Sequence, residues 1–164
     1  MKTQGNGASG GVSPIKKRIA QQISGRLPGL TAQQAQKLAG IARGRSYAAG
    51  DVIFNAGDHA TEVFLLLQGR VSLKTKFATY GDTITLASVR PLEFFGWSSL
   101  MLPQIKTAQA DVVEAAKVLV FQADELLALC DADPALGYVV MRCLLNTVGQ
   151  RLIATRRWIL DILT

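Results

Sequence analysis

A change in the period of the apolar residues divides the chain into three parts and limits its fold more than any other feature. Between about residues 47 and 121 the apolar residues alternate or form short runs, as in β-strands, whereas the flanking segments have helical spacing. No helical pattern separates the strand-like segments, which excludes a βαβ fold. Turn residues punctuate them at Gly50-Asp51, Gly57-Asp58, Gly69, Gly81-Asp82 and Gly96. The pattern predicts a mainly β barrel or roll with flanking helices.

Local signals set the boundaries of the predicted parts. Ser13-Pro14 is a typical helix start, Thr31 and Gln34 have the spacing of a capping box, and Asp133-Pro134 begins a long helix. The glycine-rich start has little to bury and is predicted to be disordered. The chain thus divides into a lead-in (1–13), N-terminal helices (14–45), a β-roll (46–123) and C-terminal helices (124–164).

The long C-terminal helix has an apolar seam whose spacing alternates between four and three residues. This is a heptad repeat, which predicts a homodimer through paired helices. The alternative is that both apolar faces lie in the core of the monomer. A second stripe is expected to face the chain's own roll and contains Leu144, Ile153, Leu160 and Leu163. The seam consists of Met141, Leu145, Val148, Leu152, Thr155, Ile159 and Ile162.

Composition excludes several classes of protein. The 164 residues are 49% hydrophobic, but no apolar run approaches the roughly 20 residues of a membrane span. Only Cys130 and Cys143 are present, which excludes a disulfide scaffold and favours a reducing cytoplasm. His59 is the one histidine, so a metal or haem site lacks partners. No catalytic motif is complete, and we expect neither an enzyme nor a metalloprotein.

Positive charge is concentrated near the N-terminus. Residues 1–50 contain eight basic and no acidic residues, whereas the remainder has a net charge of −2. This segment is either a solvated basic helix pair or a contact for RNA, DNA, an acidic protein or a membrane surface. The basic residues considered for such a contact are Lys16, Lys17 and Arg18.

Two motifs resemble the cyclic nucleotide-binding domain family, the sensor module of catabolite-activator and Fnr-type regulators, cyclic-nucleotide-dependent kinases and gated channels. The likeness extends from about Leu27 to Leu163. It implies an eight-stranded double-stranded β-helix, or jelly-roll-like β-roll, with N-terminal helices and a long C-terminal helix. The motifs are Tyr47-x-x-Gly50-Asp51-x-Ile53-Phe54-x-x-Gly57-Asp58 and Glu62-Val63-Phe64-Leu65-Leu66-Leu67-x-Gly69-Arg70-Val71.

The resemblance also implies a ligand site. In the family a segment that begins Gly-Glu and ends Pro-Arg-Ser/Thr-Ala holds phosphate and ribose, and a Thr after an Arg-Leu pair on the long helix contacts the purine. Here Trp97 falls on the Glu and Lys106 on the Arg, which removes the ribose acceptor and the bidentate fork. We therefore expect weak cyclic AMP binding. The candidate ligand-binding residues are Gly96, Trp97, Ser98, Ser99, Lys106, Thr107, Ala108 and Thr155, the last following Arg151-Leu152.

These observations predict a cytoplasmic, bacterial-type, ligand-sensing regulatory module that signals through a protein partner. Its ligand would be a cyclic nucleotide or another small anion, and the sequence identifies no cofactor. No helix-turn-helix follows the long helix, so we expect no sequence-specific DNA binding by this chain alone. Two alternatives stay open: the sensor part of a Crp/Fnr-type transcription regulator, and a structural dimerisation module with a non-functional pocket.

Overall fold

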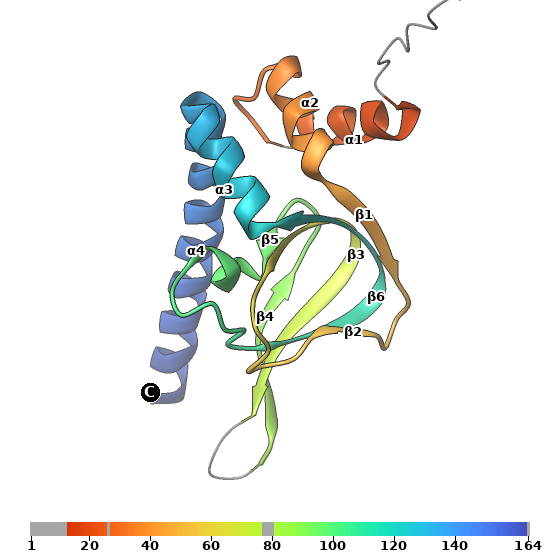
Figure 1. Cartoon of the computed structure of the whole chain (residues 1–164). Coiled ribbons are helices and arrows are strands. Elements are labelled where there is room, and N and C mark those ends of the chain that lie inside the picture. The colour runs from red at the N-terminus through yellow and green to blue at the C-terminus, as the bar shows by residue number, and fades with distance from the viewer. Residues whose placement is uncertain (1–12, 26, 77–80, 164) are drawn as a thin grey trace, which may run out of the picture.

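The computed structural model describes residues 13–25, 27–76 and 81–163. Within these residues a six-stranded antiparallel sheet curls into a roll, with two α-helices before it and two after it. Figure 1 shows α1 and α2 at one end of the roll and α4 along its side. The predicted β-roll with flanking helices is confirmed. The elements are α1 (Pro14–Ser24), α2 (Ala32–Ile41), β1 (Arg43–Tyr47), β2 (Val52–Phe54), β3 (Glu62–Lys76), β4 (Thr83–Val89), β5 (Phe94–Phe95), the 3-10 helix η1 (Trp97–Leu100), β6 (Gln109–Gln122), α3 (Ala123–Ala132) and α4 (Pro134–Leu163).

Two long strands form the centre of the sheet. Its order is β1-β6-β3-β4, with β2 paired to β6 and β5 to β3. The described residues form six strands instead of the eight implied by the resemblance, in part because β3 continues through the turn predicted at Gly69. The turn predicted at Gly69 is wrong. The register shifts between Gln68 and Arg70, so this glycine bends β3 without ending it.

The roll buries both of its faces. Alternate residues of β3 point to opposite sides, so Val63 and Leu65 pack against the helices, whereas Phe64 and Leu66 point into the roll. This explains why β3 begins with a continuous apolar run. Phe64 lies against Phe95 at a ring-centroid distance of 5.0 Å, and the ring of Phe54 lies beside both. Aromatic side chains therefore fill the part of the roll beside the candidate ligand site.

Several basic residues of the N-terminal segment hold the fold together. The predicted capping box at Thr31 is present, and Lys16 Nζ donates to the main-chain oxygens of Gly40 and Ala42 at the end of α2. Lys37 forms an ion pair with Asp133 at the start of α4. The high positive charge of this segment is thus partly used in internal contacts. The predicted disordered lead-in lies outside the described residues except for residue 13.

The helix α4 is buried on one side, and the side chains that the structure describes in its last third are exposed. Leu136, Val140 and Leu144 are buried, whereas the seam side chains from Met141 to Ile159 are 37–69% exposed where they are apolar. The Ile162 side chain lies outside the described part. The second stripe was predicted wrongly, because only Leu144 packs on the domain and Ile153, like the rest of the stripe, is exposed. Nine residues rotate a helix by about 180°, which places Ile153 opposite Leu144.

No helix in the described part of the chain combines the length and the hydrophobicity that a membrane span requires.

Candidate functional site

The segment from Gly96 to Ala108, called the cassette below, joins β5 to β6 and begins with η1. Gly96 has φ 72°, a backbone conformation that favours glycine. Lys106 is almost completely buried, and its Nζ donates to the main-chain oxygens of Glu62 (2.7 Å) and Gly96 (2.9 Å). The same ammonium lies 4.6 Å from the ring centroid of Phe54. The charge of Lys106 is therefore directed at main-chain carbonyls and aromatic rings of its own domain.

Burial also changes the acidity of Lys106. Desolvation lowers the pKa of its ammonium to about 8, against the opposing attraction of Glu62 and Asp58. The main chain of Lys106 exchanges hydrogen bonds with Asp58 and Gly57, which fix the end of the cassette to the preceding turn. The predicted contact of Lys106 with a phosphate would require these internal bonds to open, and it stays a prediction.

A small cavity of about 50 Å³ lies between the cassette, the roll and α4. Phe54, Leu73 and Arg151 complete its lining. Small-molecule sites usually provide about 300–1,000 Å³, so this cavity has no room for a nucleotide. Five of the eight candidate ligand-binding residues line it: Gly96, Trp97, Ser98, Thr107 and Ala108.

The other three candidate residues do not border this cavity. Ser99 is buried and its hydroxyl donates to the main-chain oxygen of Gly96. Lys106 lies behind the lining, as described above. Thr155 is exposed on α4, where its hydroxyl donates to the main-chain oxygen of Arg151. A ligand contact by Thr155 therefore remains a prediction.

Arg151 is a site residue that the sequence reasoning did not select. Its guanidinium carbon lies 4.1 Å from the ring centroid of Trp97, and Nη2 donates to the main-chain oxygen of Phe94 (2.9 Å). Desolvation lowers the pKa of Arg151 to about 10, against the attraction of Glu93, so the group stays charged at neutral pH. Its position beside Leu152, in the Arg-Leu pair before Thr155, was the available signal. Through Arg151, α4 is attached to the cassette and to β5.

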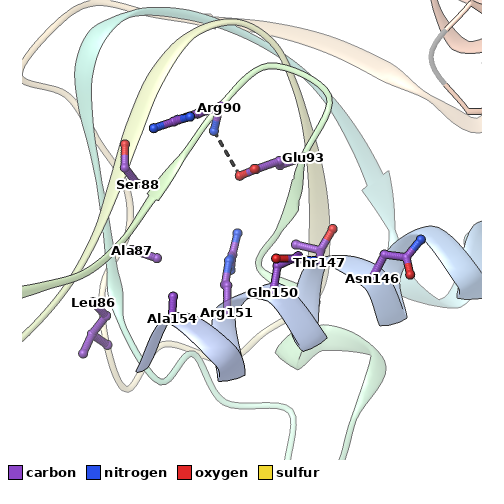
Figure 2. Close-up of a pocket in the computed structure, with 10 residues that line it drawn as sticks. All are labelled: Leu86, Ala87, Ser88, Arg90, Glu93, Asn146, Thr147, Gln150, Arg151 and Ala154. Atoms are coloured by element: carbon purple, nitrogen blue, oxygen red, sulfur yellow. Dashed lines mark hydrogen bonds between the residues drawn. The ribbon is translucent and has the colours of Figure 1, made fainter. Parts of the chain in front are cut away.

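A larger cleft of about 600 Å³ lies between β4 and α4. Figure 2 shows Arg151 extending from α4 into this cleft, with Arg90 and Glu93 on the roll side. The main-chain N–H of Arg90 donates to the carboxylate of Glu93. Arg151 borders both the cleft and the small cavity. The cleft has the volume of an ordinary small-molecule site, and the side chain of Arg151 connects it to the cassette.

Comparison with known proteins is consistent with this architecture. The family model for the cyclic nucleotide-binding domain matches residues 44–133, more than half of the chain. The chain therefore belongs to the cyclic nucleotide-binding domain family. No curated protein matches it.

Solved structures with the same fold come from several bacteria. A protein from Geobacter metallireducens that is assigned as cyclic nucleotide-binding is 30% identical, with a TM-score of 0.66 over 80% of this chain and 95% of that chain. The catabolite activator protein of Thermus thermophilus is 27% identical, with a TM-score of 0.68 over 85% and 63%. A cyclic nucleotide-binding domain from Methylobacillus flagellatus is 18% identical, with a TM-score of 0.80 over 88% and 84%. The fold is that of a regulatory domain.

Proposed function

We propose that this chain is a ligand-sensing regulatory module in which a ligand at the junction of the roll and α4 changes the position of α4. The observation that carries the proposal is the contact of Arg151 with Trp97 and with the main chain of Phe94. A ligand that draws the guanidinium away would release α4 from the cassette. Because α4 extends beyond its contacts with the roll, a change at Arg151 would be passed to whatever binds the exposed part of the helix.

The exposed seam of α4 supports a homodimer as the regulated assembly. Its apolar side chains recur with heptad spacing and lack cover in the monomer, whereas Leu144 on another face of the helix is buried. Two copies that pair through this seam would place the two ligand junctions beside one shared interface. A ligand-dependent shift of α4 would then alter the geometry of the pair, which a protein partner can read.

Replacing Arg151 with Gln tests the coupling between α4 and the cassette. The change removes the cation–π contact and the charged donor, which together are worth about 1–2 kcal/mol. We expect hydrogen exchange in the cassette to become about tenfold faster. Mass-spectrometric exchange measures this directly, with Arg156→Gln as the matched control because Arg156 is exposed on the same helix. Unchanged exchange in the cassette of Arg151→Gln would contradict the proposal.

A second prediction concerns the nucleotide. Wild-type protein is expected to bind cyclic AMP poorly, because Trp97 offers no acceptor to the ribose and Lys106 is bonded to main-chain carbonyls. The Trp97→Glu, Lys106→Arg double variant should bind at least about tenfold more tightly, since each charge-assisted hydrogen bond contributes about 1.5–3 kcal/mol. Calorimetric titration with cyclic AMP measures the affinity of the wild type and of the double variant, with Trp158→Glu as the control. Micromolar binding by the wild type with no gain in the double variant would show this reasoning to be wrong.

The small volume of the cavity favours one competing function, a dimerisation module with a non-functional pocket. Such a module would keep the seam of α4 but would need no mobile contact at Arg151. The two functions differ in their response to a ligand: binding at the junction should change hydrogen exchange in the cassette of a regulatory module and leave it unchanged in a purely structural one. The further alternative, the sensor part of a Crp/Fnr-type transcription regulator, shares the proposed mechanism and differs in the partner that receives the signal.

A further inference from the structure

The end of α4 carries exposed apolar residues both in the seam and beside it. Residues 152–163, called the tail below, are exposed at every side chain that the structure describes. Figure 1 shows the tail at the end of α4 that lies away from α1 and α2. Its apolar side chains include Leu152, Trp158, Ile159 and Leu163, which are 46–76% exposed. The tail therefore has an apolar surface that its own domain leaves in contact with water.

The order of leucine and β-branched residues in the seam favours more than two helices. In a heptad abcdefg, the four-residue steps of the seam run from d to a, so Leu145 and Leu152 occupy a positions. Val148 and Thr155 occupy the d positions that follow them. Two parallel helices favour β-branched residues at a and leucine at d, whereas leucine at a with isoleucine at d favours three or four. The seam follows the second arrangement, because its a residues are leucine and its d residues are β-branched.

Apolar residues also occupy the positions that flank the seam in the tail. Trp158 lies at g and Leu163 lies at e, where paired helices often carry charged residues. The other e position of the tail holds Arg156, whose long stem can pack while its charge stays in water. An apolar face that includes e or g as well as a and d is typical of helices in the core of a bundle. The apolar face of the tail is thus wider than a two-stranded seam requires.

The roll limits access to this wider face. Leu144, Arg151 and Trp158 are seven residues apart and so lie on one side of α4. Leu144 is buried in the domain and Arg151 contacts Trp97, whereas Trp158 is 51% exposed beyond these contacts. A further helix therefore has access to the g side of α4 at the tail, where the roll does not cover it.

We infer that the tails of four copies of this chain form a helix bundle that joins two homodimers. Each homodimer pairs through the seam, and the Trp158 side chains lie between the two pairs. The inference rests on the homodimer of the proposed function, to which it adds a second pair. Because the tail has fewer turns than the whole seam, joining two pairs buries less apolar surface than pairing and requires a higher protein concentration. A shift of α4 at Arg151 in one copy would reach the other copies through the bundle.

Sedimentation equilibrium over a range of concentrations measures the number of chains in the assembly. We expect wild-type protein to pass from two chains to four as its concentration rises. Trp158→Gln should raise the Kd for association of the two pairs at least about tenfold and leave the homodimer intact. Arg157→Gln is the matched control, because Arg157 lies at f, away from the seam, and this variant should associate as the wild type does.

A second variant tests the packing of the seam without removing its apolar residues. Leu145→Ile, Val148→Leu and Leu152→Ile together place isoleucine at a and leucine at d, which is the arrangement that two helices favour. We expect this triple variant to remain at two chains at concentrations where the wild type reaches four. Four chains in both the triple variant and Trp158→Gln, at the wild-type concentration, would overturn the bundle.

The outcomes separate the bundle from the proposed function. Wild-type protein that stays at two chains at every concentration overturns the bundle and leaves the proposed homodimer standing. Wild-type protein that stays monomeric overturns both. If four chains form and Trp158→Gln returns them to two, the bundle stands. Unchanged hydrogen exchange in the cassette of Arg151→Gln would then contradict the signalling role alone.

Discussion

Replacing Leu152 with Asp is expected to convert a homodimer of this chain into a monomer. Leu152 lies near the centre of the α4 seam and is 50% exposed in the single chain, with Leu145 and Ile159 one heptad away on either side. Burial of a leucine side chain contributes about 1.5–3 kcal/mol, and the interface contains two copies. The substitution also brings two carboxylates together in an apolar contact. We expect the dimer Kd to rise about 100-fold or more.

Sedimentation velocity over a range of protein concentrations measures this change. Ile153→Asp is the matched control, because Ile153 is the next residue, is 45% exposed and is about 100° away from Leu152 around the helix. The control introduces the same charge beside the seam and should remain dimeric. A wild-type chain that sediments as a monomer at high concentration would contradict the seam interface. Equal dissociation of both variants would show that charge on α4, and not the seam, governs assembly.

The fold was largely predictable because its signals are local or periodic. The capping box at Thr31 and the proline starts of α1 and α4 depend on a few neighbouring residues, and they appear where the sequence indicates. The number of strands was not predictable in the same way. A glycine between two apolar runs has the same appearance in a turn and in a bent strand, and the pairing of β3 with β6 decides between them.

The positions of the candidate residues were predictable in part, but the directions of their side chains were not. Sequence alignment with the family motif selected eight candidate residues, of which five line one small cavity, and their contact with a ligand stays a prediction. It could not show that Lys106 turns its ammonium towards Glu62 and Gly96, because that direction depends on carbonyls brought together by the fold. Arg151 was overlooked for a similar reason. Its contact with Trp97 joins elements far apart in the chain, and neither residue alone indicates a pair.

Replacing Gly69 with Ala is expected to remove a large part of the stability of the roll. Gly69 has φ 88°, and a Cβ there would lie 2.8 Å from the main-chain oxygen of Glu114 and closer still to that of Ala115. Both oxygens belong to β6, so a clash could be relieved only by separating the two central strands. Backbone strain of about 1–2 kcal/mol adds to a cost of overpacking of about 1–3 kcal/mol, for a total loss of about 2–5 kcal/mol in the free energy of unfolding.

Urea unfolding measures this loss, and Gly57→Ala is the control that separates its two causes. Gly57 has φ 90°, almost the same backbone conformation, but a Cβ there would meet no atom within 4 Å beyond its chain neighbours, so only strain of about 1–2 kcal/mol should appear. A similar loss in both variants would mean that backbone conformation alone accounts for the effect at Gly69. A clearly larger loss at Gly69 would show that close approach of β3 and β6 requires glycine there. That approach holds β6 against the strand that carries Phe64 and Leu73, the second of which lines the small cavity.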